Sequence, residues 1–213
     1  MKKGKIKLNK KYSPMGQYGW SNEDESCVGE FETMENQENK YSKSIGMFII
    51  SFSNMEDCID RDFAKSIHDD ADEPGYRIIK YLSFRDKINL LKDDYLAFIK
   101  YCCPKSKQEQ ILSELNIIYC KLVELSEFRN KIAHANWHSL DKSGFVRCKI
   151  TESKENVGIV FEKVKMTPGV LIKFTRQNYA ISNKLDGFRE KIWETINRYE
   201  YKERLKEERH IRK

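Results

Sequence analysis

The chain has 213 residues, which is enough for one ordinary domain and too few for two. Hydrophobic residues make up 39% and charged residues 34%, and no apolar run approaches the roughly 20 residues of a membrane span, so we expect a cytoplasmic protein with no membrane contact. The net charge of +6 is compatible with a phosphate-bearing partner but does not establish one.

Residues 1–44 predict a polar arm rather than part of the core. Asn, Glu and Ser dominate Ser21–Lys43, and such a composition buries little surface, so we expect a flexible or loosely docked segment. The main domain is expected in residues 45–200. A charged helical tail is expected in residues 201–213.

Two stretches after the arm have apolar side chains at the three- and four-residue spacing of an amphipathic helix. The first begins at Ile45 and is interrupted by Asp69–Gly75. The second begins near Ser83, where Ser83 and Asp86 predict a capping box, and ends at Pro104. Their stripes are Ile45, Phe48, Ile49, Phe52, Met55, Ile59, Phe63 and Ile67 for the first, and Phe84, Ile88, Leu91, Tyr95 and Phe98 for the second.

The third predicted helix has the most regular stripe, and an arginine stands in it. The apolar positions step by three and four residues and the helix is expected to end near Asn136 and Trp137. Its stripe is Ile111, Leu115, Ile118, Leu122, Leu125, Arg129 and Ile132.

The pattern then changes to strands. Phe145–Ile150, Gly158–Val164 and Val170–Thr175 are rich in Val, Ile and Phe and predict a small meander, with a turn at Pro168-Gly169 between the last two. A final helix is expected through Leu185 and Tyr199. The predicted fold is therefore mainly α: an antiparallel helical bundle with a three-stranded β insertion at about residues 145–175 before the last helix.

Arg129 needs an explanation at a core-facing position, because taking a guanidinium out of water costs several kcal/mol unless an anion compensates it. Two interpretations remain open. Either Arg129 forms a buried ion pair and His134 caps the helix, or the stripe opens there onto a pocket or a second subunit. His134 shares a helical face with Asn130 and lies roughly 140° around the helix from Arg129.

The string Phe128-Arg129-Asn130-Lys131-Ile132-Ala133-His134-Ala135 resembles the signature of the HEPN superfamily. That signature places an arginine, a polar residue and, after four to six intervening residues, a histidine near the end of a long bundle helix. Leu82–Ile88 is similar to the second helix of abortive-infection HEPN proteins, and the resemblance extends over about Ile45–Tyr199. It implies an HEPN-type bundle and metal-independent cleavage of RNA, typical of toxins and antiphage defence proteins.

The residue types suit that chemistry. Cleavage of RNA by its own 2′-hydroxyl needs a proton acceptor and a proton donor, and histidine serves as either near neutral pH. Arg129 would stabilise the charge on the phosphate, and Asn130 would orient His134 or the phosphate. Because one chain supplies one motif, the resemblance implies a homodimer with a composite site.

Lys131, Trp137 and His138 are candidate substrate-binding residues next to the motif, although a solvated lysine, a tryptophan closing the core and an exposed histidine are the simpler interpretations. The six cysteines and four histidines lack metal-ligand spacing, so neither a metal nor another cofactor is expected.

The resemblance implies RNA as substrate and an antitoxin or defence-system protein as partner. Asn136 stands where toxins regulated by nucleotidyltransferase antitoxins carry a tyrosine, so adenylylation is not expected. The alternative function is a non-catalytic HEPN-like dimerisation or nucleotide-binding module.

Overall fold

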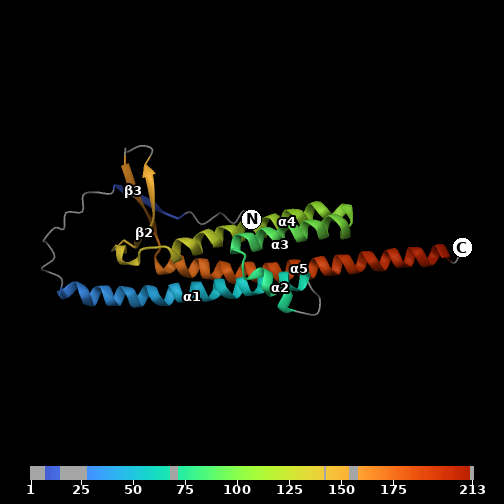
Figure 1. Cartoon of the computed structure of the whole chain (residues 1–213), viewed down its shortest axis with the longest axis horizontal. Helices are drawn as coiled ribbons and strands as arrows, with labels where there is room; N and C mark the ends of the chain where they lie inside the picture. The colour runs from blue at the N-terminus through green and yellow to red at the C-terminus, as the bar shows by residue number, and fades with distance from the viewer. Residues whose placement is uncertain (1–7, 15–27, 68–71, 142, 154–157, 212–213) are drawn as a thin grey trace. The chain divides into compact units, whose positions relative to one another are not determined.

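The computed structural model describes residues 8–14, 28–67, 72–141, 143–153 and 158–211. These residues are mainly helical, as predicted, with a small antiparallel sheet whose strand β3 precedes the final helix (Figure 1). The elements are β1 (Lys10–Pro14), α1 (Val28–Ile67), α2 (Asp72–Ile79), α3 (Phe84–Cys102), α4 (Lys105–Ala133), the 3₁₀ turn η2 (Trp137–Ser139), β2 (Phe145–Ser153), β3 (Gly158–Lys165) and α5 (Pro168–Ile211). Every helix in these ranges is too short or too polar to cross a membrane.

The chain divides into two compact units. The sheet unit consists of Met1–Ile50 and Phe128–Thr175, and the helical unit consists of Ser51–Glu127 and Arg176–Lys213. Their boundaries fall inside α1, α4 and α5. The proposed division into an arm, a domain and a tail is not tested by these units and stays a prediction.

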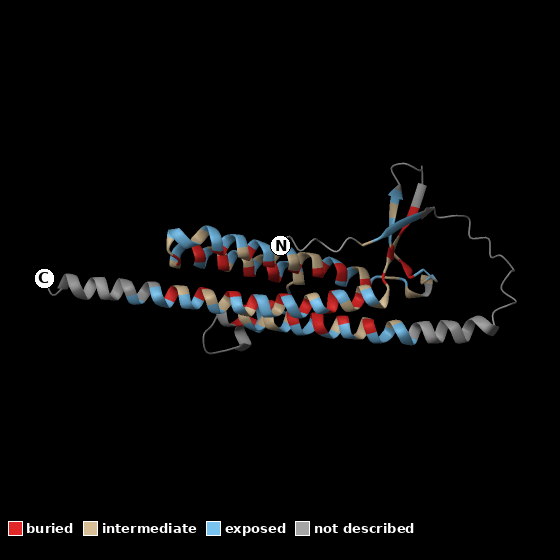
Figure 2. Cartoon of the chain, turned by 180° about the vertical axis from the view of Figure 1, so that it is seen from behind, coloured by how far each residue is buried: buried red, intermediate tan, exposed pale blue. Residues whose placement is uncertain are grey.

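In the helical unit, α1, α3, α4 and α5 each bury an apolar face, and the buried residues form stripes along the helices in Figure 2. The ring of Tyr95 in α3 packs edge to face on Phe188 in α5, with 5.3 Å between ring centroids. Ile99 is buried in α3, whereas Phe98 is 44% exposed, so the predicted stripe of this helix is wrong at its last position. Both residues fit the three- or four-residue step from Tyr95, and the smaller side chain occupies the core.

The interruption predicted at Asp69–Gly75 is shorter than expected, because α2 begins at Asp72. Its Gly75 lies against the backbone of Ala64 in α1, next to the apolar cluster of Phe63, Ala64 and Ile79. A Cβ at position 75 would stand 2.6 Å from the Cα and 2.8 Å from the carbonyl oxygen of Ala64. A glycine is therefore required where α2 meets α1.

We expect Gly75→Ala to push α2 away from α1 and to lower the free energy of unfolding by about 1–3 kcal/mol, measured by urea denaturation. Gly187→Ala is the matched control, because a Cβ there meets nothing within 4 Å. It should stabilise α5 by about 0.5–1 kcal/mol. Equal effects of the two substitutions would contradict the close approach at Gly75.

The sheet has the strand order β1-β3-β2, with both pairs antiparallel. The edge strand β1 belongs to the segment predicted as a polar arm. It pairs with β3, with Lys10 opposite Val164 and Pro14 opposite Val160. The strand predicted over Val170–Thr175 is wrong, because these residues form the first turns of α5. The predicted insertion therefore contributes two strands, and the N-terminal segment contributes one.

The start of α5 explains the error. The amide of Leu171 donates to the carbonyl of Thr167 at 3.0 Å, and the amide of Val170 lies 3.4 Å from the Thr167 hydroxyl. Thr167 therefore caps the helix, and Pro168 occupies the first helical position, where its missing N–H costs nothing. Leu171 and Phe174 are buried at a helical three-residue step.

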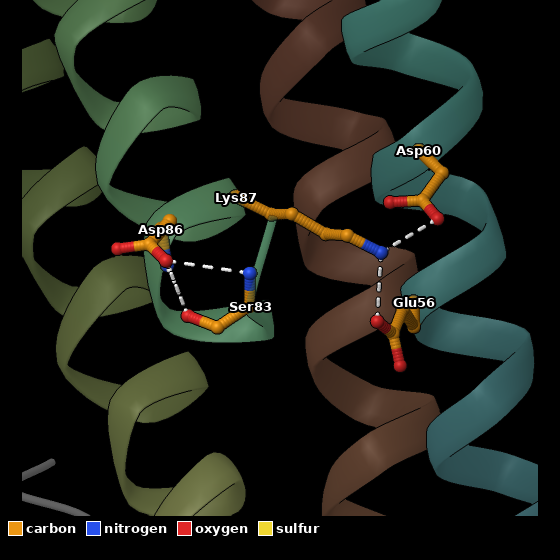
Figure 3. Close-up of polar contacts among 5 residues, drawn as sticks. All are labelled: Glu56, Asp60, Ser83, Asp86 and Lys87. Carbon is orange, nitrogen blue, oxygen red and sulfur yellow. Dashed lines mark hydrogen bonds and ion pairs between the residues drawn. The ribbon is translucent and has the colours of Figure 1, made fainter. Parts of the chain in front are cut away.

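A capping box begins α3, as predicted. The Asp86 amide lies 3.2 Å from the Ser83 hydroxyl oxygen, and the Ser83 amide donates back to the Asp86 carboxylate at 3.3 Å. One residue later, Lys87 extends toward α1 and donates to Glu56 at 2.8 Å and to Asp60 at 2.9 Å (Figure 3). The cap therefore fixes the first turn from which this ammonium reaches both carboxylates.

Burial and the hydrogen bonds within this cluster shift the pKa values of its groups in opposing directions. Burial by itself lowers the pKa of Lys87, but hydrogen bonds to Asp60 and Glu56 outweigh it, and the pKa stands above its ordinary value. Burial also raises the pKa of Asp60, and the Lys87 ammonium offsets only part of that rise. The ammonium is therefore the group that keeps an ionised Asp60 tolerable inside the helical unit.

Candidate functional site

The packing at the end of α4 is carried by Phe128 and not by Arg129. Phe128 is buried in the sheet unit, where its ring stacks on Phe174 with 3.5 Å between centroids and meets Phe48 edge to face at 5.2 Å. Arg129 is exposed. The expectation that Arg129 occupies the core-facing stripe is therefore wrong, and so is the interpretation of a buried ion pair.

The shift by one position has a simple cause. Leu125, Phe128 and Ile132 step by three and four residues, which is as helical as the predicted step from Leu125 to Arg129. Between two neighbours that both fit the period, the aromatic side chain enters the core, because burying the guanidinium would cost more.

The three motif residues lie at the surface around the C-terminal end of α4. Arg129, Asn130 and His134 are all exposed. The guanidinium Nη1 of Arg129 donates to the side-chain oxygen of Asn130 at 3.2 Å, and the backbone amide of His134 donates to the carbonyl of Asn130 at 3.0 Å. That backbone bond extends the helical repeat one residue beyond α4, so His134 keeps the position it would have on the helix.

Trp137 closes this end of α4. Its indole N–H donates at 3.2 Å to the carbonyl of Ile132 in the last turn, which also accepts the backbone amide of Ala135 at 3.4 Å. Its ring lies 6.2 Å from that of Tyr41 in α1. Trp137 is only half-buried. These contacts position the turn that contains His134.

The segment after the motif is fixed to β2. The Asn136 amide donates to the Arg147 carbonyl at 2.8 Å, and the Arg147 amide donates to the Ser139 hydroxyl at 2.8 Å. The Ser139 hydroxyl in turn donates to the Asn136 carbonyl at 2.6 Å. Ser139 and Tyr41 cannot be identified from the sequence, because neither belongs to a motif and their roles depend on contacts made in the folded chain.

The other two candidate substrate-binding residues are Lys131 and His138. Lys131 is half-buried, and its ammonium stands 4.0 Å from the Glu162 carboxylate of β3. Glu162 also pairs with Lys10 of β1 at 2.7 Å. Lys131 is therefore part of an internal charge cluster, in addition to any contact with a substrate. The side chain of His138 lies outside the described residues.

Chemically, the exposed group offers a planar cation, an amide and an imidazole at one helix end, held by a tryptophan cap and by a strand. Such a set can bind an anionic oxygen and exchange a proton with a bound molecule. Comparisons of the chain with protein-family models, curated proteins and solved structures found no match.

Proposed function

We propose that this chain is a metal-independent endoribonuclease of the HEPN type, acting in the cytoplasm as a toxin-like or antiphage effector. The observation that carries the proposal is the exposed set Arg129, Asn130 and His134 at the end of α4. Packing does not account for Arg129, since Phe128 and Ile132 fill the core at that point. The resemblance of the motif to the HEPN signature supplies the reaction class.

In the proposed reaction, the 2′-hydroxyl of RNA loses its proton and attacks the adjacent phosphorus, while the leaving 5′-oxygen gains a proton. The products are a 2′,3′-cyclic phosphate and a 5′-hydroxyl. His134 transfers one of the two protons, and Arg129 stabilises the negative charge on the phosphate oxygens. The hydrogen bond from Arg129 to Asn130 supports the proposal, because it holds the guanidinium beside the face that Asn130 shares with His134.

A homodimer completes the proposed site. Arg129 and His134 lie roughly 140° apart around one helix, and one chain contributes a single motif histidine. Two copies of the motif facing each other would supply both the proton acceptor and the proton donor. An antitoxin or another defence-system protein is proposed as the regulator on the basis of the resemblance.

The test is a cleavage assay on structured and unstructured RNA in the presence of EDTA. We expect the wild-type chain to cleave RNA, His134→Ala to lower the rate by about 10²–10⁴-fold, and Arg129→Ala to lower it by about 10²–10³-fold. Arg129→Lys should cleave RNA little faster than Arg129→Ala, because an ammonium lacks the planar arrangement of donors that a guanidinium offers to phosphate. Glu127→Ala is the matched control, since it removes an exposed charge of α4 beside the motif.

Glu127→Ala should cleave at the wild-type rate, and all variants should unfold like the wild type. Cleavage that persists in His134→Ala would refute the proposal. A wild-type dimer that binds nucleotides but cleaves no RNA would favour the non-catalytic module instead.

A further inference from the structure

Basic side chains share one face of the sheet. In antiparallel strands, directly opposite residues point to the same face. Lys163 of β3 lies opposite Lys11 of β1 on one side and opposite Arg147 of β2 on the other. Lys165 is on this face too, because side chains alternate with a period of two along a strand. We call these four residues the basic sheet face.

Aromatic rings lie beneath these cations. The Lys11 ammonium stands 4.2 Å from the centroid of the Phe145 ring, and the Lys165 ammonium stands 5.8 Å from it. The Arg147 guanidinium stands 4.8 Å from the centroid of Phe161. Both rings are buried, whereas Lys11 is exposed and the other three cations are partly exposed. The rings therefore hold the cations in fixed places at the surface.

The two faces of the sheet differ in how their charges are compensated. On the opposite face, the nearly buried Glu162 pairs with Lys10 and Lys131. On the basic sheet face, Lys11, Lys163 and Lys165 have no carboxylate partner among the described residues. Glu152 is on this face by register, but it lies four residues along from the row of Lys163, or about 13 Å.

This arrangement is costly for the fold by itself. Like charges directly opposite in neighbouring strands destabilise a sheet, and here three cations stand in one row across all three strands. A polyanion that binds Lys11, Lys163 and Lys165 weakens the repulsion among these lysines and gains ion pairs with them. The backbone phosphates of a nucleic acid supply such a row of anions.

We infer that the basic sheet face binds the sugar–phosphate backbone of single-stranded RNA. The choice of RNA rests on the proposed function, and the row is three strands wide, about 10 Å, which suits one backbone rather than a duplex. The face belongs to the same compact unit as Arg129, Asn130 and His134. It contacts phosphates and not base edges, so it contributes affinity without sequence preference.

The decisive substitution is Lys163→Glu. The new carboxylate would stand between Lys11 and Arg147, so cross-strand attraction replaces repulsion and the melting temperature should stay constant or rise. The same carboxylate repels phosphate. Loss of RNA binding together with undiminished stability distinguishes a binding role from a structural one.

Binding is measured by fluorescence anisotropy with a labelled single-stranded RNA, in a His134→Ala background that prevents cleavage. We expect Lys163→Glu to weaken binding about tenfold or more, and the slope of log affinity against log salt to become shallower by about 0.7 for each phosphate that the variant no longer neutralises. Lys173→Glu is the matched control, an exposed lysine of α5 in the same unit whose reversal changes the net charge equally. It should bind RNA as the parent does.

Unchanged binding by Lys163→Glu, or equal weakening by Lys173→Glu, would overturn the inference. So would equally tight binding to vesicles containing phosphatidylserine. The outcomes separate this inference from the nuclease proposal. A wild type that cleaves RNA while Lys163→Glu binds normally refutes only the basic sheet face, and RNA binding that depends on Lys163 without any cleavage refutes only the nuclease.

Discussion

Replacing Phe128 with alanine should lower the free energy of unfolding by about 3–5 kcal/mol, the range for truncating a fully buried phenylalanine. Phe128 is 1% exposed, and its ring contacts both Phe48 of α1 and Phe174 of α5. The substitution removes the stacked and the edge-to-face contact together and leaves a cavity where three helices meet. Urea denaturation followed by circular dichroism measures the loss.

Arg129→Ala, at the neighbouring position, is the matched comparison. Because Arg129 is exposed, we expect its removal to change the free energy of unfolding by no more than about 0.5 kcal/mol. The pair of variants therefore separates packing from chemistry at the end of α4. A strongly destabilised Arg129→Ala beside a stable Phe128→Ala would mean that the guanidinium, and not the ring, holds the core.

Lys87→Met should lower the free energy of unfolding by about 2–4 kcal/mol. The substitution keeps the length of the side chain but leaves Glu56 and Asp60 without their ammonium. Removing one partner of a buried ion pair costs about 3–5 kcal/mol, and we expect somewhat less here because the Glu56 side chain is 27% exposed. Adding Glu56→Gln and Asp60→Asn to Lys87→Met should restore most of the loss.

The effect should depend on pH in a definite direction. Burial raises the pKa of Asp60 even beside Lys87, so folding favours its protonated form, and that stability is present at low pH and lost as the pH rises through the raised pKa. In Lys87→Met the ammonium no longer lowers the pKa of Asp60, so the free energy of unfolding depends more strongly on pH. The difference in the free energy of unfolding between Lys87→Met and the wild type should therefore become smaller as the pH falls from neutral toward the pKa values of the carboxylates. A difference that widens would contradict this account of the cluster.

Much of the helical fold could be predicted from the sequence, because three- and four-residue spacing reports a buried helical face directly. The capping box can also be predicted, because it depends only on Ser83 and on Asp86 three residues later. Val170–Thr175 was misassigned because a short apolar run rich in β-branched residues fits a strand and a buried helix equally well. The preceding Thr167-Pro168 pair is a helix-start signal and would have decided between them.

The exposed position of Arg129 is harder to predict. Leu125 is followed at three and at four residues by Phe128 and Arg129, and periodicity alone does not choose between them. The cost of burying a guanidinium does choose, and it favours the ring. The motif is local in sequence and can be proposed from it, whereas the expected position of Arg129 in the core-facing stripe is wrong.

The basic sheet face could not be predicted at all. It depends on β1 pairing with β3, which are separated by most of the chain, and on the register that places Lys11, Lys163 and Arg147 in one row. The alternating cations Lys163 and Lys165 were visible in the sequence. The strand that pairs with them, β1, lies in a segment whose polar composition predicts an arm and not a strand.

The most direct measurement of the central claim is the mass of the fragments that the wild-type chain produces from an RNA oligonucleotide in the presence of EDTA. The account predicts that the upstream fragment ends in a 2′,3′-cyclic phosphate and the downstream fragment in a 5′-hydroxyl, and that neither forms with His134→Ala. Intact oligonucleotide with the wild type, or fragments that end in a 3′-hydroxyl and a 5′-phosphate, would contradict it.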